Sequence, residues 1–278
     1  MQPIINQLVQ LQELIVALAQ QKAGSPGAQL RELEESIHAL KSGIPEAIDR
    51  QFSRLIQKDP LAIVPVMKGV CAACGMALPI SLTHEVHAAE KIYTCPSCAR
   101  MLYYSEGGPR NTRKPPRRSD PPRVGIERFS AESLMIPSLA GTDRDSILRE
   151  MSRKLADEGF VDNAPELAEG SIRREAIIST TVDHGLAFPH VRCVEGGALT
   201  MALGIAQKPV KFDPAGKAVT RIIFFMVIPT AASAFYLKLL SGLSQTFLKE
   251  ENREKLLTAE TPEKLWKALV KTTRQIIQ

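Results

Sequence analysis

The sequence predicts a multi-domain protein: an N-terminal α-helical coiled-coil hairpin with a small cysteine-bearing ribbon, followed by a C-terminal α/β domain. Three observations predict this class. Apolar residues in the first part follow a coiled-coil spacing, four of the five cysteines form two CxxC pairs, and the last part alternates strand-like runs with amphipathic helices. Because such alternation buries a sheet between two helical layers, we expect a mixed sheet flanked by helices on both faces.

Length and composition limit the function classes. A chain of 278 residues with 44% hydrophobic content is long enough for two compact units. Its apolar runs stay below the ~20 residues that span a bilayer, and its N-terminus lacks the charged-then-apolar pattern of an export signal. Paired CxxC cysteines are typical of metal binding in a reducing compartment rather than of a disulfide framework. We therefore expect a cytoplasmic protein with no membrane span.

The domain 1–58 is predicted to be a helical coiled-coil hairpin. Turn-forming residues at 24–27 separate two helices, and a third helical piece covers 46–58. The seam positions recur at steps of four and three: Ile4, Leu8, Leu11, Ile15 and Leu18, then Leu30, Leu33, Ile37 and Leu40. Isolated helices this short are marginal in water. Either they form a homodimer or bind a partner, or the hairpin packs only on itself, and the sequence leaves both alternatives open.

Two CxxC pairs predict a metal centre in the domain 59–104. Each CxxC turn directs two thiolates at one point, and four thiolates complete a closed tetrahedral shell around a structural zinc ion. The predicted ligands are Cys71, Cys74, Cys95 and Cys98. The alternative, a redox dithiol, needs only one CxxC in a βαβ setting. His84 and His87 lie between the pairs and are expected on the surface.

An apolar strand precedes the cysteines at Val64-Pro65-Val66, and an apolar and aromatic ending follows them at 100–104. With the two CxxC pairs, these features make residues 43–104 resemble the C4-type zinc-ribbon family, which follows a coiled-coil hairpin in small bacterial proteins. Ala99 stands where that family usually has a glycine. Some members are implicated in contacts with nucleic acid or transcription factors, so the resemblance implies binding rather than catalysis.

A basic, proline-rich linker is predicted at 105–125. It contains Gly, Pro and Arg with almost nothing to bury, so we expect an extended tether. Most of the chain's net charge of +5 comes from its cations, Arg110, Arg113, Lys114, Arg117, Arg118 and Arg123. These side chains either contact RNA, DNA or an acidic protein, or are simply solvated.

The remaining residues, 126–278, predict an α/β domain. Asp143 can cap a first helix, and a second helix at 165–172 leads into Arg174. Thr261 can cap the last helix. The other predicted elements are strands at 199–205 and 219–228 and helices at 233–248 and 262–276.

His190 follows a proline at the end of an apolar run. A proline fixes the backbone, so we expect the histidine where a rigid strand meets solvent, with one imidazole nitrogen presented to a partner. Neutral imidazole is a good nucleophile near pH 7. The stretch 174–190 contains, in this order, Arg174-Glu175, Ser179-Thr180, Gly185, Ala187, Pro189 and His190.

This pattern resembles the phosphoacceptor motif of type-2 enzyme IIA domains of the phosphoenolpyruvate:sugar phosphotransferase system, the fructose/mannitol/nitrogen-regulatory class. The resemblance runs from about residue 126 to the C-terminus. It implies that His190 accepts a phosphoryl group from phospho-HPr and relays it to enzyme IIB or keeps it as a regulatory signal. Arg174 then supplies a forked cation for the phosphoryl oxygens. The hydroxyls of Ser179, Thr180 and Tyr236 are expected to support phosphate binding.

Two departures from the motif concern the same site. Residues 181–184 replace the family's glycine-rich turn and leave only Gly185, so backbone shapes with positive φ become costly. Tyr236 stands where the family usually has a second histidine. A tyrosine can hydrogen-bond a phosphate but does not provide a second imidazole.

Two function classes follow. The first is a protein-histidine phosphotransferase, a phosphoryl carrier of the sugar-transport phosphotransferase system. The alternative is a non-enzymatic zinc-ribbon adaptor that binds nucleic acid or a transcription component and has a degenerate enzyme IIA-like domain. Arg174 and His190 favour the first class, and Tyr236 and the altered turn favour the second. The interpretation we prefer combines them: the phosphorylation state of His190 tunes what the N-terminal half binds.

Overall fold

The computed structural model describes residues 1–24, 29–67, 69–105, 124–177, 179–194, 199–214, 218–229 and 233–274. They form two compact units, Met1–Gly108 and Pro109–Gln278. Almost all of the predicted linker lies outside the described residues, so its extended form and the finer domain boundaries stay predictions. Among the helices that the structure describes, none is both long enough and apolar enough to cross a membrane.

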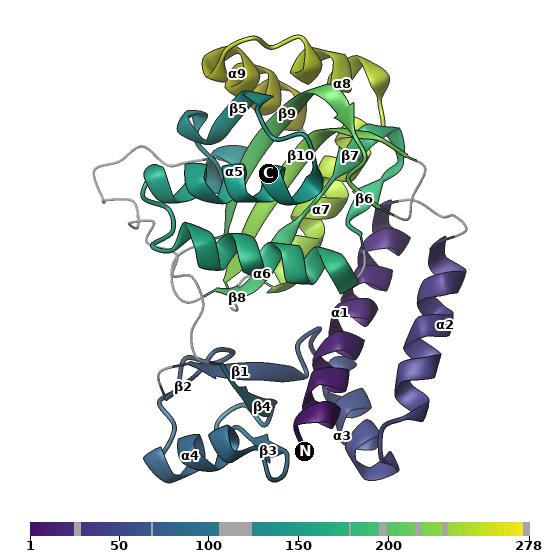
Figure 1. Ribbon diagram of the computed structural model, residues 1–278, viewed down its shortest axis with the longest axis vertical. Helices are drawn as coiled ribbons and strands as arrows, with labels where there is room; N and C mark the ends of the chain where they lie inside the picture. Colours follow the sequence, from purple (N-terminus) through teal and green to yellow (C-terminus); the bar gives the residue numbers. More distant parts are fainter. Residues whose placement is uncertain are drawn as a thin grey trace. The chain divides into compact units, whose positions relative to one another are not determined.

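The first unit contains the predicted helical hairpin (Figure 1). α1 (Gln2–Gly24) and α2 (Gln29–Ser42) pack against each other, and α3 (Glu46–Ile56) follows them. A small sheet with the order β2-β1-β4-β3 comes next. Its strands are β1 (Ile63–Met67), β2 (Val70–Cys71), β3 (Tyr93–Thr94) and β4 (Met101–Tyr104). The sequence did not predict α4 (Ile80–Ala88), which lies between the cysteine pairs.

The hairpin and the ribbon share one hydrophobic core. Apolar side chains from α1, α3, β1 and β4 meet in a single buried cluster, so the ribbon sheet is packed on the helices rather than free of them. Its fully or nearly fully buried members are Ile5, Leu8, Leu11, Ile44, Phe52, Ala62, Ile63 and Met101.

A buried glutamine also ties α1 to the ribbon. The amide oxygen of Gln12 accepts hydrogen bonds from the backbone N–H groups of Ala62 (2.7 Å) and Ile63 (2.9 Å). Its amide nitrogen donates to the Ile63 carbonyl (3.0 Å). Among the described residues, β2 pairs only with Val66 and Met67, so it provides no hydrogen bonds to the first half of β1. The Gln12 amide satisfies these buried peptide groups in place of a neighbouring strand.

The second unit is built on the predicted mixed sheet, with the strand order β5-β9-β10-β7-β6 and with β8 also paired to β10. β9 runs antiparallel to β10, whereas β7 and β8 run parallel to it. The strands are β5 (Met135–Leu139), β6 (Thr181–Val182), β7 (Leu186–Ala187), β8 (His190–Val194), β9 (Thr200–Val210) and β10 (Thr220–Pro229).

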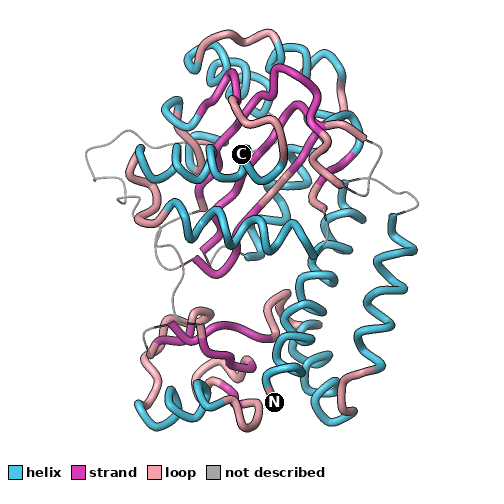
Figure 2. The backbone as a smooth tube through the Cα atoms, viewed as in Figure 1, coloured by secondary structure: helices cyan, strands magenta, loops and turns pink. Residues whose placement is uncertain are grey.

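Helices cover both faces of this sheet, as predicted. α5 and α6 lie on one face and α7 on the other (Figure 1), with the strands between them in magenta in Figure 2. Asp143 and Ser146 form a capping box at the start of α5, and Thr261 caps α9. The helices are α5 (Arg144–Asp157), α6 (Ala164–Ile177), α7 (Ser233–Phe247), α8 (Glu250–Leu257) and α9 (Pro262–Thr273). The sequence did not predict β5 and α8.

The segment that carries His190 runs along β10 as an interrupted strand. β7 and β8 pair with β10 in the same direction, and the interruption between them is Phe188 and Pro189. Met226 donates its backbone N–H to the Pro189 carbonyl (2.9 Å) and lies opposite His190 in the register. His190 therefore begins its strand beside the buried central strand of the sheet.

The two cysteine turns of the ribbon have matching backbone geometry. Gly75 has a φ of 72° and donates its N–H to the Cys71 carbonyl (2.9 Å). Ala99 has a φ of 62° and donates its N–H to the Cys95 carbonyl (2.8 Å). Each turn thus requires a left-handed residue after its second cysteine, a conformation that is strained for alanine.

We expect Ala99→Gly to raise the free energy of unfolding of the first unit by about 0.5–1 kcal/mol, because relief of the strain outweighs the extra freedom that glycine gives the unfolded chain. Chemical denaturation at fixed metal concentration measures this. Gly75→Ala is the matched control and should lose a similar amount, because a Cβ there meets nothing within 4 Å and adds only backbone strain. Unchanged unfolding midpoints in both variants would contradict the prediction.

Candidate functional site

His190 is buried, which corrects the expectation that it faces solvent. Its side chain is only 1% exposed. Two neighbours explain this: β10 lies alongside it, and the ring of Tyr236 from α7 lies 5.2 Å from its ring between centroids. Tyr236 is itself fully buried. The motif could not indicate this burial, because it depends on packing against a helix that comes much later in the chain.

The two ring nitrogens of His190 have different surroundings. Nδ1 lies 3.1 Å from the Phe188 carbonyl oxygen and 3.1 Å from the Tyr236 hydroxyl. A carbonyl oxygen can only accept, so this contact assigns the proton of the neutral ring to Nδ1. Nε2 is shielded from solvent and has no hydrogen-bond partner within the part of the chain that the structure describes. The lone pair of the imidazole is therefore on Nε2.

The surroundings of His190 hold its pKa well below the usual 6.5. Burial is the largest cause, because it penalises the charged ring, and the positive charges of Arg174 and Arg192 add to it. The Phe188 carbonyl acts in the opposite direction but does not outweigh them. His190 is thus a neutral imidazole beside two guanidinium groups at neutral pH.

Arg174 lies in the last turn of α6 and is 7% exposed. Its charge acts on His190, so the structure brings together the two principal residues of the motif. Arg192 was not among the predicted site residues. It follows His190 by two positions on β8, and because side chains alternate along a strand, the sequence spacing could have placed both on one face.

Ser179 and Thr180 contact Glu175 rather than His190. Glu175 is 2% exposed and accepts hydrogen bonds from the Thr180 N–H (2.6 Å), the Thr180 hydroxyl (2.9 Å) and the Ser179 hydroxyl (3.1 Å). Burial raises the pKa of Glu175, whereas these donors and Arg174 lower it less strongly. Glu175 thereby fixes the chain between α6 and β6, a role that our sequence analysis missed.

The turn between β6 and β7 adopts positive φ values at two positions, of which only one is a glycine. His184 has a φ of 68° and Gly185 a φ of 76°. The sequence indicated this cost, since a non-glycine residue occupies a left-handed position. The His184 side chain is exposed, unlike the buried ring of His190.

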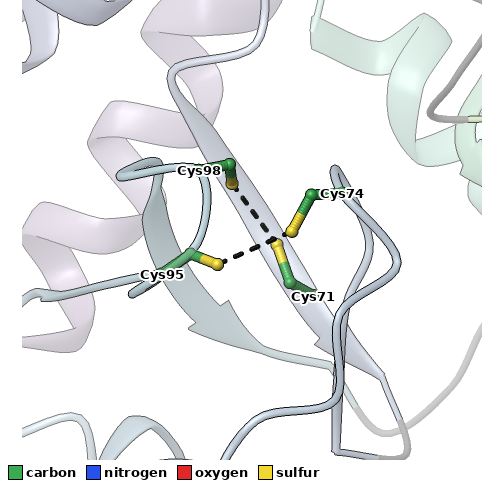
Figure 3. Close-up of side chains that lie close together, drawn as sticks. All are labelled: Cys71, Cys74, Cys95 and Cys98. Carbon is green, nitrogen blue, oxygen red and sulfur yellow. Dashed lines mark hydrogen bonds between the residues drawn. The ribbon is translucent and has the colours of Figure 1, made fainter.

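The four cysteines of the ribbon converge, as Figure 3 shows. Their sulfur atoms all lie within 4.8 Å of one another. The Sγ–Sγ distances are 3.8 Å for Cys71–Cys98 and 3.7 Å for Cys74–Cys95. A tetrahedron with Zn–S bonds of about 2.3 Å has sulfur–sulfur edges of about 3.8 Å, so this arrangement fits a zinc ion. His84 and His87 are exposed on α4, outside this group, as the sequence predicted.

The low pKa of His190 predicts a specific pH dependence of stability. Below pH 6.5 the unfolded chain protonates this histidine before the folded chain does, so its contribution is present above that pH and is lost as the pH falls. The free energy of unfolding should fall by up to about 1.4 kcal/mol per pH unit from this group. His190→Gln should remove that component from denaturation curves measured between about pH 7 and pH 5. His184→Gln, on the exposed turn, is the control and should leave that component in place. The same pH dependence of the free energy of unfolding in wild type and His190→Gln would contradict the prediction.

Two family models match the chain. The model described as "Phosphoenolpyruvate-dependent sugar phosphotransferase system, EIIA 2" matches residues 128–272, slightly more than half of the chain. The model described as "C4-type zinc ribbon domain" matches residues 70–102. The two matches contain His190 and all four paired cysteines, respectively.

Curated relatives match part of the chain. The fructose-specific EIIA component of Haloferax volcanii is 30% identical over 105 residues, which are 38% of this chain and 68% of that protein. The nitrogen regulatory protein of Pseudomonas aeruginosa is 24% identical over 147 residues, 53% of this chain and 96% of that protein. The 2-O-alpha-mannosyl-D-glycerate-specific EIIABC component of Escherichia coli is 25% identical over 130 residues, but the chain spans only 20% of its length.

Among solved structures, the nitrogen regulatory protein IIA-Ntr from Neisseria meningitidis is similar with a TM-score of 0.46 and 24% identity, over 51% of this chain and 96% of that one. The first family match spans the whole motif around His190 and the strands of the mixed sheet. The chain therefore belongs to the type-2 EIIA family of the phosphoenolpyruvate-dependent sugar phosphotransferase system, and it carries a C4-type zinc-ribbon domain in its N-terminal half.

Proposed function

We propose that this protein is a phosphoryl carrier in which Nε2 of His190 accepts a phosphoryl group from phospho-HPr. The group then passes to enzyme IIB or stays as a signal to a regulatory target protein. One observation carries the proposal: Nε2 of a neutral imidazole has no hydrogen-bond partner among the described residues, while Nδ1 is already engaged. A lone pair kept free in this way is available for nucleophilic attack.

The contacts of Nδ1 support that attack. When Nε2 bonds to phosphorus, positive charge develops on the ring, and the Nδ1–H becomes a stronger donor. The Phe188 carbonyl and the Tyr236 hydroxyl oxygen lie where they stabilise this charge. Tyr236 thus acts through the acceptor ring, on the side away from Nε2, rather than as a second imidazole.

Arg174 supplies charge for the phosphoryl group. Phosphoryl transfer spreads negative charge over three equatorial oxygens, which a nearby guanidinium neutralises. Ser179 and Thr180 contribute indirectly. They lie directly after α6 and hydrogen-bond to Glu175, which lies in the last turn of that helix beside Arg174. These hydroxyls support the site by fixing its backbone.

Transfer requires access to a nitrogen that is shielded from solvent. The donor's phosphohistidine must reach Nε2 along the line of the breaking N–P bond. The surroundings of His190 therefore have to open when the donor docks, and they close over the phosphoryl group afterwards. Exclusion of water in the closed form protects the phosphohistidine from hydrolysis.

The N-terminal half is proposed to be a binding module held by a structural zinc ion on Cys71, Cys74, Cys95 and Cys98. When bound, zinc cross-links the two cysteine turns. Residues 1–105 contain nine Lys and Arg and nine Asp and Glu residues, so this half lacks the positive excess that nucleic-acid binding needs. A protein, such as a transcription component, fits this charge balance better than DNA or RNA.

The alternative function is a non-enzymatic adaptor with a degenerate EIIA domain. His184 in a left-handed turn and Tyr236 beside His190 favour it, because both replace residues typical of the family. We favour the combined function, in which phosphorylation of His190 tunes what the N-terminal half binds. Phosphoryl uptake separates the two alternatives.

Incubation with phosphoenolpyruvate, enzyme I and HPr should add one acid-labile phosphoryl group, detected by intact mass. His190→Ala should abolish it, because the variant lacks the nucleophile. Arg174→Ala should retain the acceptor but slow its phosphorylation roughly ten- to a hundredfold, the loss expected for one charge-assisted contact of ~1.5–3 kcal/mol.

His184→Ala is the matched control, since it removes an exposed histidine from the neighbouring turn, and it should be phosphorylated like the wild type. If folded wild-type protein takes up no phosphoryl group, the carrier proposal is wrong and the adaptor alternative stands. Uptake that persists in His190→Ala would place the acceptor elsewhere.

Metal analysis after mild purification should find one zinc ion per chain. Cys71→Ser and Cys98→Ser should each weaken zinc retention against a chelator, because each removes one of four thiolates from a closed shell. Cys193→Ser, which changes the fifth cysteine, is the control and should bind zinc like the wild type. Equal zinc content in all three variants would contradict the assignment.

A further inference from the structure

Arg192 has buried donors that nothing in the described part of the chain satisfies. Its Nε and Nη1 are shielded from solvent and have no hydrogen-bond partner among the described residues. A buried charged donor without an acceptor destabilises a fold and calls for an explanation, and a bound anion is the one that fits a guanidinium. The guanidinium of Arg192 therefore indicates a missing anionic ligand.

The position of Arg192 identifies that ligand. His190 and Arg192 are two residues apart on β8, whose side chains alternate between faces, and the charge of Arg192 acts on the His190 ring. Nε2 of His190 is likewise shielded and without a partner among the described residues. A phosphoryl group on Nε2 would bring three acceptor oxygens to the same face of the strand as Nε and Nη1 of Arg192.

We propose that Arg192 is a second guanidinium ligand of the phosphoryl group on His190 and that it prolongs the life of the phosphorylated form. This inference rests on the proposed phosphoacceptor role of His190. It adds a residue outside the motif and favours one outcome of that role, namely retention of the phosphoryl group as a signal over rapid relay.

The chemistry of the step shows why a second cation favours retention. The His190 Nε2 lone pair forms the new N–P bond, the donor's N–P bond breaks, and its electron pair returns to the donor imidazole. The proton on Nδ1 of His190 stays in place. The phosphoryl group is dianionic when bound, but in the loose transition state that follows, its charge is closer to that of metaphosphate. Two guanidinium groups thus stabilise the bound state more than the transition state for leaving.

The test compares wild type, Arg192→Met, Arg192→Lys and Arg173→Met. Arg173 is exposed on α6 beside Arg174 and provides the control for a lost cation outside the site. Each protein is equilibrated with fixed ratios of phospho-HPr to HPr, and the half-life of its phosphohistidine is measured after HPr is removed. In Arg192→Met, the phosphoryl-transfer equilibrium should shift roughly tenfold or more toward HPr, with a shorter half-life. Arg192→Lys should be intermediate, and Arg173→Met should match the wild type.

Equal occupancy and half-life in wild type and Arg192→Met would overturn the inference, and so would an equal effect of Arg173→Met. If Arg192→Met does not fold, the same comparison with Arg192→Lys decides the question, because lysine keeps the charge but loses the fork. Phosphoramidate, a chemical donor, separates this inference from the proposed function. Wild type that is loaded by phosphoramidate but not by phospho-HPr contradicts the proposed donor, while the half-lives of the variants still test Arg192. Loading by neither donor overturns both.

Discussion

The contact between the Phe188 carbonyl and Nδ1 of His190 is the constraint on which the functional site depends. It assigns the ring proton to Nδ1 and thereby leaves the lone pair on Nε2. The carbonyl is held firmly in place: Phe188 donates its N–H to the Thr180 carbonyl (3.1 Å), and its ring stacks on Phe224 with centroids 5.2 Å apart. Pro189 then interrupts the strand between β7 and β8, so the Phe188 carbonyl faces the imidazole.

The charges around this ring are organised for an anion. Arg174 and Arg192 both disfavour a positive imidazole, and Glu175, the buried carboxyl of the same region, has its oxygens engaged by Ser179 and Thr180. The carboxyl therefore fixes the backbone between α6 and β6. A neutral imidazole beside cations avoids the desolvation cost of an imidazolium ion and keeps its lone pair. The same arrangement makes the site electropositive before any phosphoryl group is present.

Much of the fold could be predicted from the sequence, because its signals are local. The seam of α1 and α2, the Asp143 cap and the branched residues of β9 and β10 each depend on spacing within one element. α8 escaped prediction because Leu256 is its only residue buried among those described, so it has little apolar periodicity. β5 contains Pro137 and alternates poorly, which hides a strand at the end of a sheet. Such elements are defined by their neighbours.

The candidate site likewise has features that local sequence order predicts and features that depend on distant residues. The order of residues in 174–190 indicated His190 and Arg174, but not the burial of the histidine, which needs Tyr236 from a distant helix. The partner of Ser179 and Thr180 was hidden for a different reason: the chain turns back on Glu175 directly after α6, and hydroxyls near a motif do not reveal which acceptor they choose. Of the site residues that the sequence did not indicate, Arg192 could have been found from the alternation of side chains along a strand.

The amide of Gln12 has a consequence for how this protein can be divided. It mimics a peptide unit of a strand that the ribbon does not itself possess, so α1 completes the hydrogen bonding of β1 from outside the ribbon sequence. A ribbon that begins at residue 59 and is fused to another protein would leave the backbone groups of Ala62 and Ile63 without hydrogen-bond partners. A strand of another molecule could then pair with them, which would promote aggregation. The smallest part of the N-terminal half that can be moved into another protein is therefore the hairpin and ribbon together. A domain boundary is tolerated after the ribbon but not between the hairpin and the ribbon.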